Sequence, residues 1–508
     1  MKKLIVAALL FASTYATAQD HAIMSKEFWL EKPTLSTVKA QIAQGFDFKD
    51  VHGAADPIVQ SISNKASADV IKYLIDQPGV DLKHTTVEGR IYLHIAAQNS
   101  DAEIADYLIA KGSDVDYLDA NGQTALTFAA YNGGISPALI EAFTKHGVDI
   151  NKKYENKKGA NLLLLTVGFD KNLLVTDYLV SKGVSLFSKD NSGNTVFDYA
   201  AKMGDIENMK TLIKRGVKFN PEAALLMASQ GTHRTDNKLE VYQYLVDDLK
   251  INPLLKNKDG QNALHAITKK QNQSEIIKYF LTKGVDVNQV DKDGNTPFIN
   301  ASGSKSAEII ALMLPKVKSI NAVNALGESA LMNAVRTSSA EVVSLLIEKG
   351  ANVNVKDKEG RGLAYHLVDA YRPAAGFGGR GGRGGNPNAL KPHEEFARKV
   401  DVLVAQKVDF SLVHKDGNTP LHLAADKNDL QILQKLTTLK VDVNARNKEG
   451  LTPLHKAAMV AKDDTILKYL LSAGAKKDIL TAFDESAYNL ARENEFLTKS
   501  NVSIEFMK

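Results

Sequence analysis

One ten-residue phrase recurs along the chain, and its period limits the fold more than any other feature. The clearest copies are DGNTPLHLAA at 416–425 and EGLTPLHKAA at 449–458. We call the Thr place of each copy the reference position of its unit. The reference positions are 56, 91, 124, 161, 195, 223, 262, 296, 329, 362, 419, 452 and 486. Most lie 33–35 residues apart, so the chain is a repeat array rather than the three or so domains that 508 residues suggest.

Each unit carries signals for two helices joined by turns. Thr419 can accept a hydrogen bond from a first-turn N–H, and Pro420 suits the next position, where its missing N–H costs nothing. A second phrase, LLIEKGANVN at 345–354, closes most units, and Gly350 stands where a helix ends in the left-handed region. The order predicted for each unit is turn, helix, turn, helix, with stability supplied by stacking of neighbours.

The period and the TPLH phrase resemble the ankyrin repeat. The likeness is strong at 262–362 and 419–474 and weaker at 56–223. The resemblance implies an all-α solenoid of about 13–14 helix-turn-helix units with short turn fingers. The predicted segments are an N-terminal capping unit at 19–55, repeats at 56–371, a Gly/Arg-rich insertion within a repeat at 372–392, and repeats with a C-terminal cap at 393–508.

The first 18 residues read as a secretory signal peptide. Lys2 and Lys3 precede a short apolar run, and Ala16-Thr17-Ala18 is a small-x-small cleavage site. The apolar run is about half the roughly 20 residues that a spanning helix needs, which argues against the rival reading as a membrane anchor. We therefore expect an exported protein of bacterial type, periplasmic or secreted, with no membrane span.

Composition excludes several kinds of site. The chain has no cysteine, so disulfides, thiolate metal sites and Cys nucleophiles are excluded. A net charge of +4 gives no argument for a nucleic-acid partner. Histidines recur at one place in the phrase, where the resemblance implies a hydrogen bond to backbone at the neighbouring turn: His94, His265, His422 and His455. We expect no metal, no cofactor and no catalysis.

Two segments break the period. In the first, Gly216 lies only seven residues before the reference position at 223, where a regular unit has 12, so one finger is short. The segment between the two helices of that unit, at 229–237, is longer by about as many residues as the finger has lost. This shortening is either a notch that a partner enters or decay of the repeat without consequence.

The second break is the insertion at 372–392, which contains the run FGGRGGRGGNP. It falls between a helix predicted at 363–371 and one predicted at 394–405. Such a run cannot bury enough apolar surface to become ordered, so we interpret it as a flexible spacer. A contact of Arg380 and Arg383 with an anionic polymer, a surface glycan or a protein is the alternative.

The resemblance places a partner on the fingers and first helices. Tyr131, Phe169 and Met203 are apolar at positions expected to face solvent, and interfaces favour aromatic residues and Met; scattered apolar surface residues are the plain alternative. The predicted binding residues are Asn121, Tyr131, Asn132, Phe169, Lys202, Met203, Lys269, Lys270, Arg336, Arg380 and Arg383.

These observations favour a monomeric, non-catalytic scaffold that binds a partner protein. Two alternatives stay open at this point: an anionic-polymer or glycan binder that uses the insertion and a Lys-rich face, and a hydrolase with its site in the irregular segments. Nucleic acid is not an expected partner.

Overall fold

The computed structural model describes residues 22–50, 56–232, 236–373 and 390–508. The signal peptide with its cleavage site, and Arg380 and Arg383, lie outside the described residues. Within the described part the regular structure is helical and no strand is formed; four isolated bridges join the two sides of single turns. The all-α class expected from the period is confirmed.

The first helices begin where the phrase predicts. The Thr296 side-chain oxygen accepts the Ile299 N–H at 3.1 Å, and Pro297 is the first helical residue. Thr419 and Thr452 accept from the third residue of their helices at 3.4 Å and are likewise followed by Pro. An N-cap hydrogen bond together with Pro at the first position fixes the start of the helix.

Contacts between backbone segments divide the chain into two compact units, residues 1–236 and 237–508. The division falls inside the irregular repeat whose reference position is 223. Its first helix, α13 (Pro221–Gln230), belongs to the first unit, and its second, α14 (Leu239–Gln243), belongs to the second. Each unit is described by itself.

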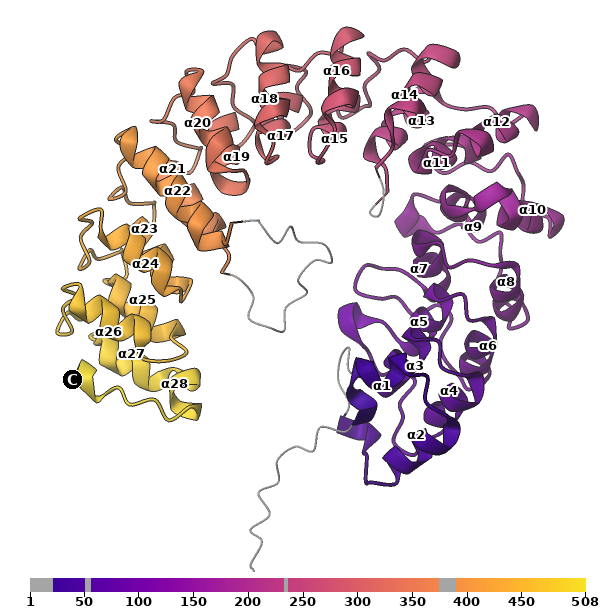
Figure 1. Ribbon diagram of the computed structural model, residues 1–508, viewed down its shortest axis with the longest axis horizontal. Helices are drawn as coiled ribbons and strands as arrows, with labels where there is room; N and C mark the ends of the chain where they lie inside the picture. Colours follow the sequence, from indigo (N-terminus) through magenta and orange to yellow (C-terminus); the bar gives the residue numbers. More distant parts are fainter. Residues whose placement is uncertain (1–21, 51–55, 233–235, 374–389) are drawn as a thin grey trace, which may run out of the picture. The chain divides into compact units, whose positions relative to one another are not determined.

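The first unit opens with η1 (Ala22–Met24), α1 (Lys26–Leu30), α2 (Leu35–Ile42) and η2 (Phe48–Asp50), and then forms two layers of helices (Figure 1). The first helices of its repeats are α3 (Pro57–Ser63), α5 (Tyr92–Gln98), α7 (Ala125–Asn132), α9 (Leu162–Thr166), α11 (Val196–Met203) and α13. The second helices are α4 (Ala68–Ile75), α6 (Ala102–Ala110), α8 (Pro137–Thr144), α10 (Leu174–Ser181) and α12 (Ile206–Lys214). Short turns are η4 (Val87–Gly89), η5 (Glu155–Lys157), η6 (Val167–Phe169) and η7 (Lys171–Leu173).

The second unit repeats this plan. Its first helices are α15 (Ala263–Ile267), α17 (Pro297–Ser302), α19 (Ala330–Thr337), α21 (Leu363–Ala370), α23 (Pro420–Asp426), α25 (Pro453–Val460) and α27 (Ala487–Glu493). Its second helices are α14 with the π-helical turn η8 (Tyr244–Asp248), α16 (Ser274–Thr282), α18 (Ala307–Met313) with η9 (Leu314–Lys316), α20 (Ala340–Glu348), α22 (Pro392–Ala405), α24 (Leu430–Thr437), α26 (Thr465–Ser472) and α28 (Glu495–Lys499), followed by η10 (Glu505–Met507).

The core of each unit lies between its helix layers. First helices contact the first helices of neighbouring repeats, as α5 does α7 and α17 does α19, and second helices do the same, as α6 does α8. The small Ala residues of the phrase, such as Ala424 and Ala425, are fully buried there. Stacking of this kind gives every repeat its burial through its neighbours.

Two sequence expectations need correction. Helix α21 ends at Ala370 rather than 371, and α22 begins at Pro392 rather than 394. Pro392, which the sequence places in the insertion, fits the first position of α22, because its missing N–H is not needed there. At the short finger the Phe219 ring packs on Phe197 of α11, with centroids 4.8 Å apart.

Candidate functional site

A hollow of about 290 Å³ opens on the first-helix layer of the first unit. Its apolar floor comes from α7, α9, η6, α11 and α13, and lysines of a finger and of α11 stand around it. The lining includes Tyr131, Leu164, Leu165, Phe169, Tyr199, Met203 and Met227, with Lys157, Lys158 and Lys202. We call this cavity the first-unit hollow.

The hollow exists because the first helix of the repeat at 161 is short. Helix α9 ends after five residues and continues as the 3-10 turn η6. At Gly168 an added Cβ would come within 3.3 Å of the Tyr199 carbonyl oxygen, so a larger residue would push this turn away from α11. The turn carries Phe169 over Gly133, where an added Cβ would lie 3.3 Å from the Phe169 Cβ.

The end of η6 is held by a buried carboxylate. Asp170 accepts the Val175 and Thr176 N–H groups at 2.9 and 2.6 Å and so caps α10. The Asn208 amide donates to the Asp170 carbonyl at 2.8 Å from the next repeat. These bonds fix the backbone on which Phe169 sits and make the aromatic side of the hollow a defined surface.

Among the described lining residues, the one acidic side chain is Asp190, and it forms hydrogen bonds within its own repeat. Asp190 accepts the Ser192 and Asn194 N–H groups at 2.9 Å and the Tyr199 hydroxyl at 3.1 Å. Burial, reinforced by Asp190, raises the pKa of Tyr199, so the phenol stays a neutral donor. Among the described residues that line the hollow, the other charged side chains are Lys157, Lys158 and Lys202.

The structure brings four of the predicted binding residues together here: Tyr131, Phe169, Lys202 and Met203. Tyr131 is 43% exposed, and the other three are half-buried. Asn121 and Asn132 do not line the hollow. Asn121 is exposed on its finger, and the Asn132 amide donates to the Phe128 carbonyl one turn back at 2.8 Å.

The remaining predicted residues lie elsewhere. Lys269 is exposed and Lys270 half-buried just after α15, in the second unit. Arg336 forms an ion pair with Glu328 and lines a separate cavity beside α22. Arg380 and Arg383 are outside the described part of the chain. The predicted set is therefore not one surface.

Sequence reasoning missed the contribution of α13. Met227, Gln230 and Thr232 line the hollow, yet they belong to the repeat with the shortened finger, where regular spacing gives no register. The missing finger lets α13 pack directly on α11, and that packing brings these residues to the site.

Three of the four recurring histidines, His94, His265 and His422, contact a backbone carbonyl of the next repeat, as the resemblance implied. The Nε2 atoms of His94 and His422 lie 2.9 Å from the carbonyl oxygens of Gln123 and Leu451, in the next repeat. Burial lowers the pKa of both rings, so they stay neutral. Among the described residues no group of three or more His, Asp or Glu side chains is arranged to hold a metal ion. No helix in that part is long and apolar enough to cross a membrane.

Comparison with known proteins gives low-identity matches to repeat segments. The chain is 24% identical over 213 residues to the human transient receptor potential cation channel subfamily A member 1, a stretch that covers 40% of this chain and 18% of the channel. It is 25% identical over 206 residues to a palmitoyltransferase of Lachancea kluyveri, covering 38% of this chain and 27% of that protein. An ankyrin repeat protein of fowlpox virus is 24% identical over 189 residues, which are 36% of this chain and 89% of the viral protein.

The chain thus spans under a third of the first two relatives, and the likeness stays within the repeats. The family model for ankyrin repeats in three copies matches residues 58–154, 264–357 and 393–481, together more than half of the chain. With helix pairs stacked at the same period and buried histidines bonded across repeats, the chain belongs to the ankyrin-repeat family.

Proposed function

We propose that the chain is a non-catalytic scaffold that binds a partner protein at the first-unit hollow. The observation that carries this proposal is the convergence of Tyr131, Phe169 and Met203 on one cavity. Aromatic residues and Met are enriched at the centres of protein interfaces. Ankyrin repeats generally mediate protein–protein binding, which supports a protein as the partner.

The size of the hollow favours one large side chain as its occupant. Pockets for small organic ligands measure about 300–1,000 Å³, and this one lies at the lower limit. Lys157, Lys158 and Lys202 at the mouth favour carboxylates beside the anchoring side chain. The proposed partner segment is therefore an aromatic or long aliphatic residue flanked by Asp or Glu.

The signal-peptide pattern at residues 1–18 supports action outside the cytoplasm, in the periplasm or beyond the cell. Detection of a mature N-terminus at Gln19 by mass spectrometry of the expressed protein tests this part of the proposal. A chain that keeps its initial residues contradicts it.

The binding proposal is tested with two triple variants. Tyr131→Ala/Phe169→Ala/Met203→Ala removes the apolar floor, and Leu118→Ala/Leu174→Ala/Phe187→Ala removes side chains that are 54%, 66% and 60% exposed in the same unit but outside the hollow. We expect affinity capture to recover the same partner with the wild type and the control triple, and the floor triple to bind it at least tenfold more weakly, the loss of about 1.4 kcal/mol or more.

Melting temperature separates binding from folding. Both triples should melt close to the wild type, since the side chains removed lie at the surface or half-buried. Full partner capture by the floor triple contradicts the proposal. A much lower melting temperature for that triple alone shows instead that these side chains belong to the core.

A further inference from the structure

The fingers of the second unit share a pattern of hydrogen bonds that the repeat spacing alone does not show. In six of the unit's seven fingers the residue five positions before the reference position accepts two backbone N–H groups of its own turn. Asp291, for example, accepts from Asp293 at 3.0 Å and Asn295 at 2.8 Å. Asn257, Asn324, Asp357, Asn447 and Thr481 do the same in their fingers. A side-chain oxygen at this place thus closes the tip of the finger.

Closed fingers are bonded to one another. A backbone N–H of one finger donates to a backbone carbonyl of the finger before it, one repeat away. In the second unit these bonds are Lys292 to Asp259, Ala325 to Asp293, Lys358 to Leu326, Lys448 to Asp416 and Ala482 to Glu449, at 2.8–2.9 Å. They form a ladder along the unit.

The ladder is broken at one junction, where His414 occupies the closing position. An imidazole there has no oxygen to accept the two turn N–H groups, and Asp416 accepts only that of Asn418, at 2.9 Å. The ladder partners at this junction are the Lys415 N–H and the Glu359 carbonyl. Neither is paired with another described residue.

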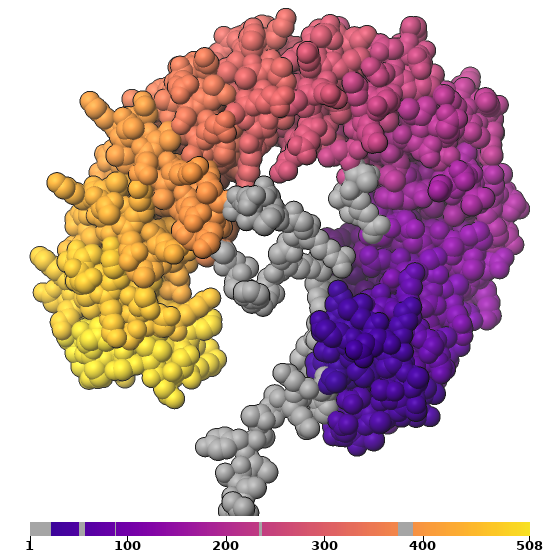
Figure 2. Space-filling view, viewed as in Figure 1, coloured from indigo at the N-terminus to yellow at the C-terminus, as the bar shows by residue number. Residues whose placement is uncertain are grey.

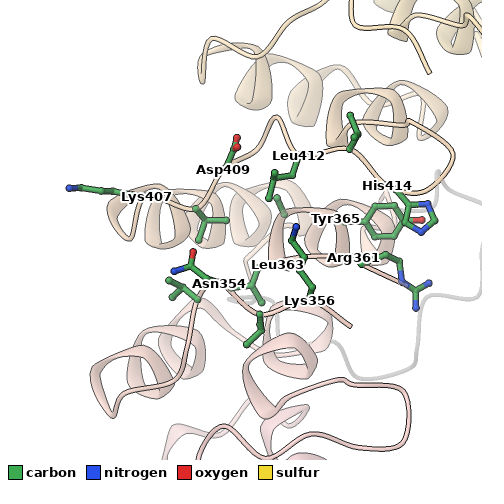
Figure 3. Close-up of a pocket in the computed structure, with 16 residues that line it drawn as sticks. Asn354, Lys356, Arg361, Leu363, Tyr365, Lys407, Asp409, Leu412 and His414 are labelled. Carbon is green, nitrogen blue, oxygen red and sulfur yellow. The ribbon is translucent and has the colours of Figure 1, made fainter. Parts of the chain in front are cut away.

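A cavity of about 130 Å³ opens between the two fingers at this break (Figure 3). The Tyr365 and His414 rings lie against each other at one end, with centroids 4.9 Å apart, and Lys407 and Asp409 stand at the other. Val353, Val355, Leu363 and Val408 give it apolar walls, and beside it Leu412 and Val413 are 47% and 59% exposed. We call this cavity the finger gap; Figure 2 shows the surface of the unit that contains it.

The charges around the finger gap are few. Arg361 is committed to Asp357 at 2.6 Å and Glu359 at 3.2 Å. Lys356 and Lys407 also line the cavity, and Asp409 caps its own turn by accepting the Ser411 N–H at 2.7 Å. Across the break the His414 Nε2 lies 3.8 Å from a Glu359 carboxylate oxygen, so these two side chains approach each other. The groups left open among the described residues are one backbone donor, one backbone acceptor and a small apolar cavity.

We propose that an extended segment of a partner polypeptide occupies the finger gap. Its carbonyl accepts the Lys415 N–H, its N–H donates to the Glu359 carbonyl, and one aliphatic side chain fills the cavity. A peptide backbone carries this donor–acceptor combination, and main-chain pairing with pockets for side chains is a known mode of peptide capture. The volume agrees, because an engineered cavity of about 150 Å³ takes a single benzene.

The cost of the break supports a functional origin. Each lost finger bond is worth about 1 kcal/mol, and the other six closing positions of this unit keep theirs. Sites where a local structural pattern is broken are often functional. In the second unit the finger-closing pattern is broken at His414, beside an open cavity. The finger gap lies in the second unit, so this inference does not depend on the first-unit hollow.

The test uses the full chain and two variants of one residue. His414→Asn supplies the oxygen that three other fingers of the unit use, and should close the finger onto Glu359. His414→Ala supplies none, so it removes the ring that lies against Tyr365 without closing the finger. A random linear peptide library displayed on phage is panned on the wild type, with His414→Asn protein as counter-selection. Synthetic copies of enriched peptides should bind His414→Asn at least tenfold more weakly than the wild type. They should bind His414→Ala more tightly than His414→Asn, because Ala removes the ring but leaves the Lys415 N–H and the Glu359 carbonyl open.

Hydrogen exchange locates the contact. The Lys415 amide should exchange faster than that of Lys448 in the free wild type, and slow at least tenfold with bound peptide or in His414→Asn. The proposal is overturned if no peptide distinguishes the wild type from His414→Asn, if bound peptide leaves Lys415 unprotected, or if Lys415 is already as protected as Lys448. Protection of Lys415 that rises with protein concentration alone assigns the gap to a second copy and also overturns it.

Discussion

At the scale of single residues, Asp198 shows how the chain adapts the repeat to its shortened finger. It occupies the place that His422 holds in a regular unit, three residues after the reference position. His422 bonds to a carbonyl of the next repeat, whereas the fully buried Asp198 accepts the N–H of Asn220 at 3.0 Å. Because the finger is shortened, α13 presents the N–H of its N-cap residue, Asn220, to Asp198. The side chain at this position must therefore accept a hydrogen bond from an N–H, whereas the histidine of a regular unit bonds to a carbonyl.

We expect Asp198→Asn to destabilise the first unit by about 1–3 kcal/mol at pH 7. The Asp198 carboxylate serves the Thr195 and Asn220 N–H groups, and an amide has one oxygen, so one buried N–H then faces an NH₂ group. Urea denaturation of the two proteins measures the difference. Equal stability contradicts the role assigned to Asp198.

The same pair of proteins has a defined pH dependence. Burial raises the pKa of Asp198 to about 6 in the folded state, from an ordinary value of 3.8. Between these values the folded state holds a proton that the unfolded state has lost, so the stabilising contribution is present below pH 4 and is lost as pH rises through about 6. The free energy of unfolding of the wild type minus that of Asp198→Asn should therefore fall across this window.

At the scale of elements, α22 shows how the repeat that carries the insertion is anchored. Two side chains one turn apart reach the preceding repeat. Glu395 accepts the Ala340 N–H at 2.5 Å, at the start of α20, and the buried Lys399 donates to the Val335 carbonyl at 3.0 Å, in the last turn of α19. An anion at a helix start and a cation at a helix end both oppose the helix dipoles favourably.

Lys399→Met should remove the contribution that Lys399 makes to the pH dependence of stability in alkali. Burial lowers the pKa of Lys399 to about 8 in the folded state, from 10.5. From about pH 8 to 10.5 the unfolded state holds a proton that the folded state lacks, so this group makes the protein more stable as pH rises. The free energy of unfolding of the wild type minus that of Lys399→Met should rise over this range.

The tyrosines of the protein also titrate in alkali, but they are common to both proteins and cancel in the difference. Lys399→Gln, which keeps a polar end without a charge, is the matched control and should follow the Met variant. If the free energy of unfolding of the wild type minus that of each variant does not change with pH, Lys399 is hydrated in the folded state.

The helices themselves could be predicted because each unit carries its own start and stop signals, as Thr296, Pro297 and Gly350 do. The irregular elements could not. Nothing in the run Leu162–Leu165 marks the early end of α9 that opens the first-unit hollow, because the break depends on how Gly168 and Tyr199 meet across repeats. His414 stands five residues before its reference position, where the other fingers of the second unit carry Asp, Asn or Thr. The sequence shows this difference, but the finger has regular length, so spacing does not mark it as irregular.

At the scale of the whole molecule, the described chain divides into two compact units. The division at 236/237 falls in the repeat where a finger is missing, and spacing alone located that irregularity without showing that it separates two compact units. In repeat proteins stability is approximately a sum over repeats and their nearest-neighbour interfaces, so cooperativity fails where an interface is weak. Two units that differ in sequence should then unfold at different denaturant concentrations.

The single tryptophan makes this testable. Trp29 is fully buried in the first unit, where its indole N–H donates to the Ile23 carbonyl at 2.7 Å, so its fluorescence reports that unit alone, whereas far-ultraviolet circular dichroism reports the helices of both. Leu346→Ala empties a fully buried site in α20 and should cost about 2–5 kcal/mol in the second unit. We expect it to lower the urea midpoint of part of the dichroism transition and to leave the Trp29 midpoint unchanged. Asp198→Asn should instead lower the Trp29 midpoint together with part of the dichroism transition. If Leu346→Ala moves the Trp29 midpoint as far as the dichroism midpoint, the chain unfolds as one cooperative array and the two-unit description does not govern its stability.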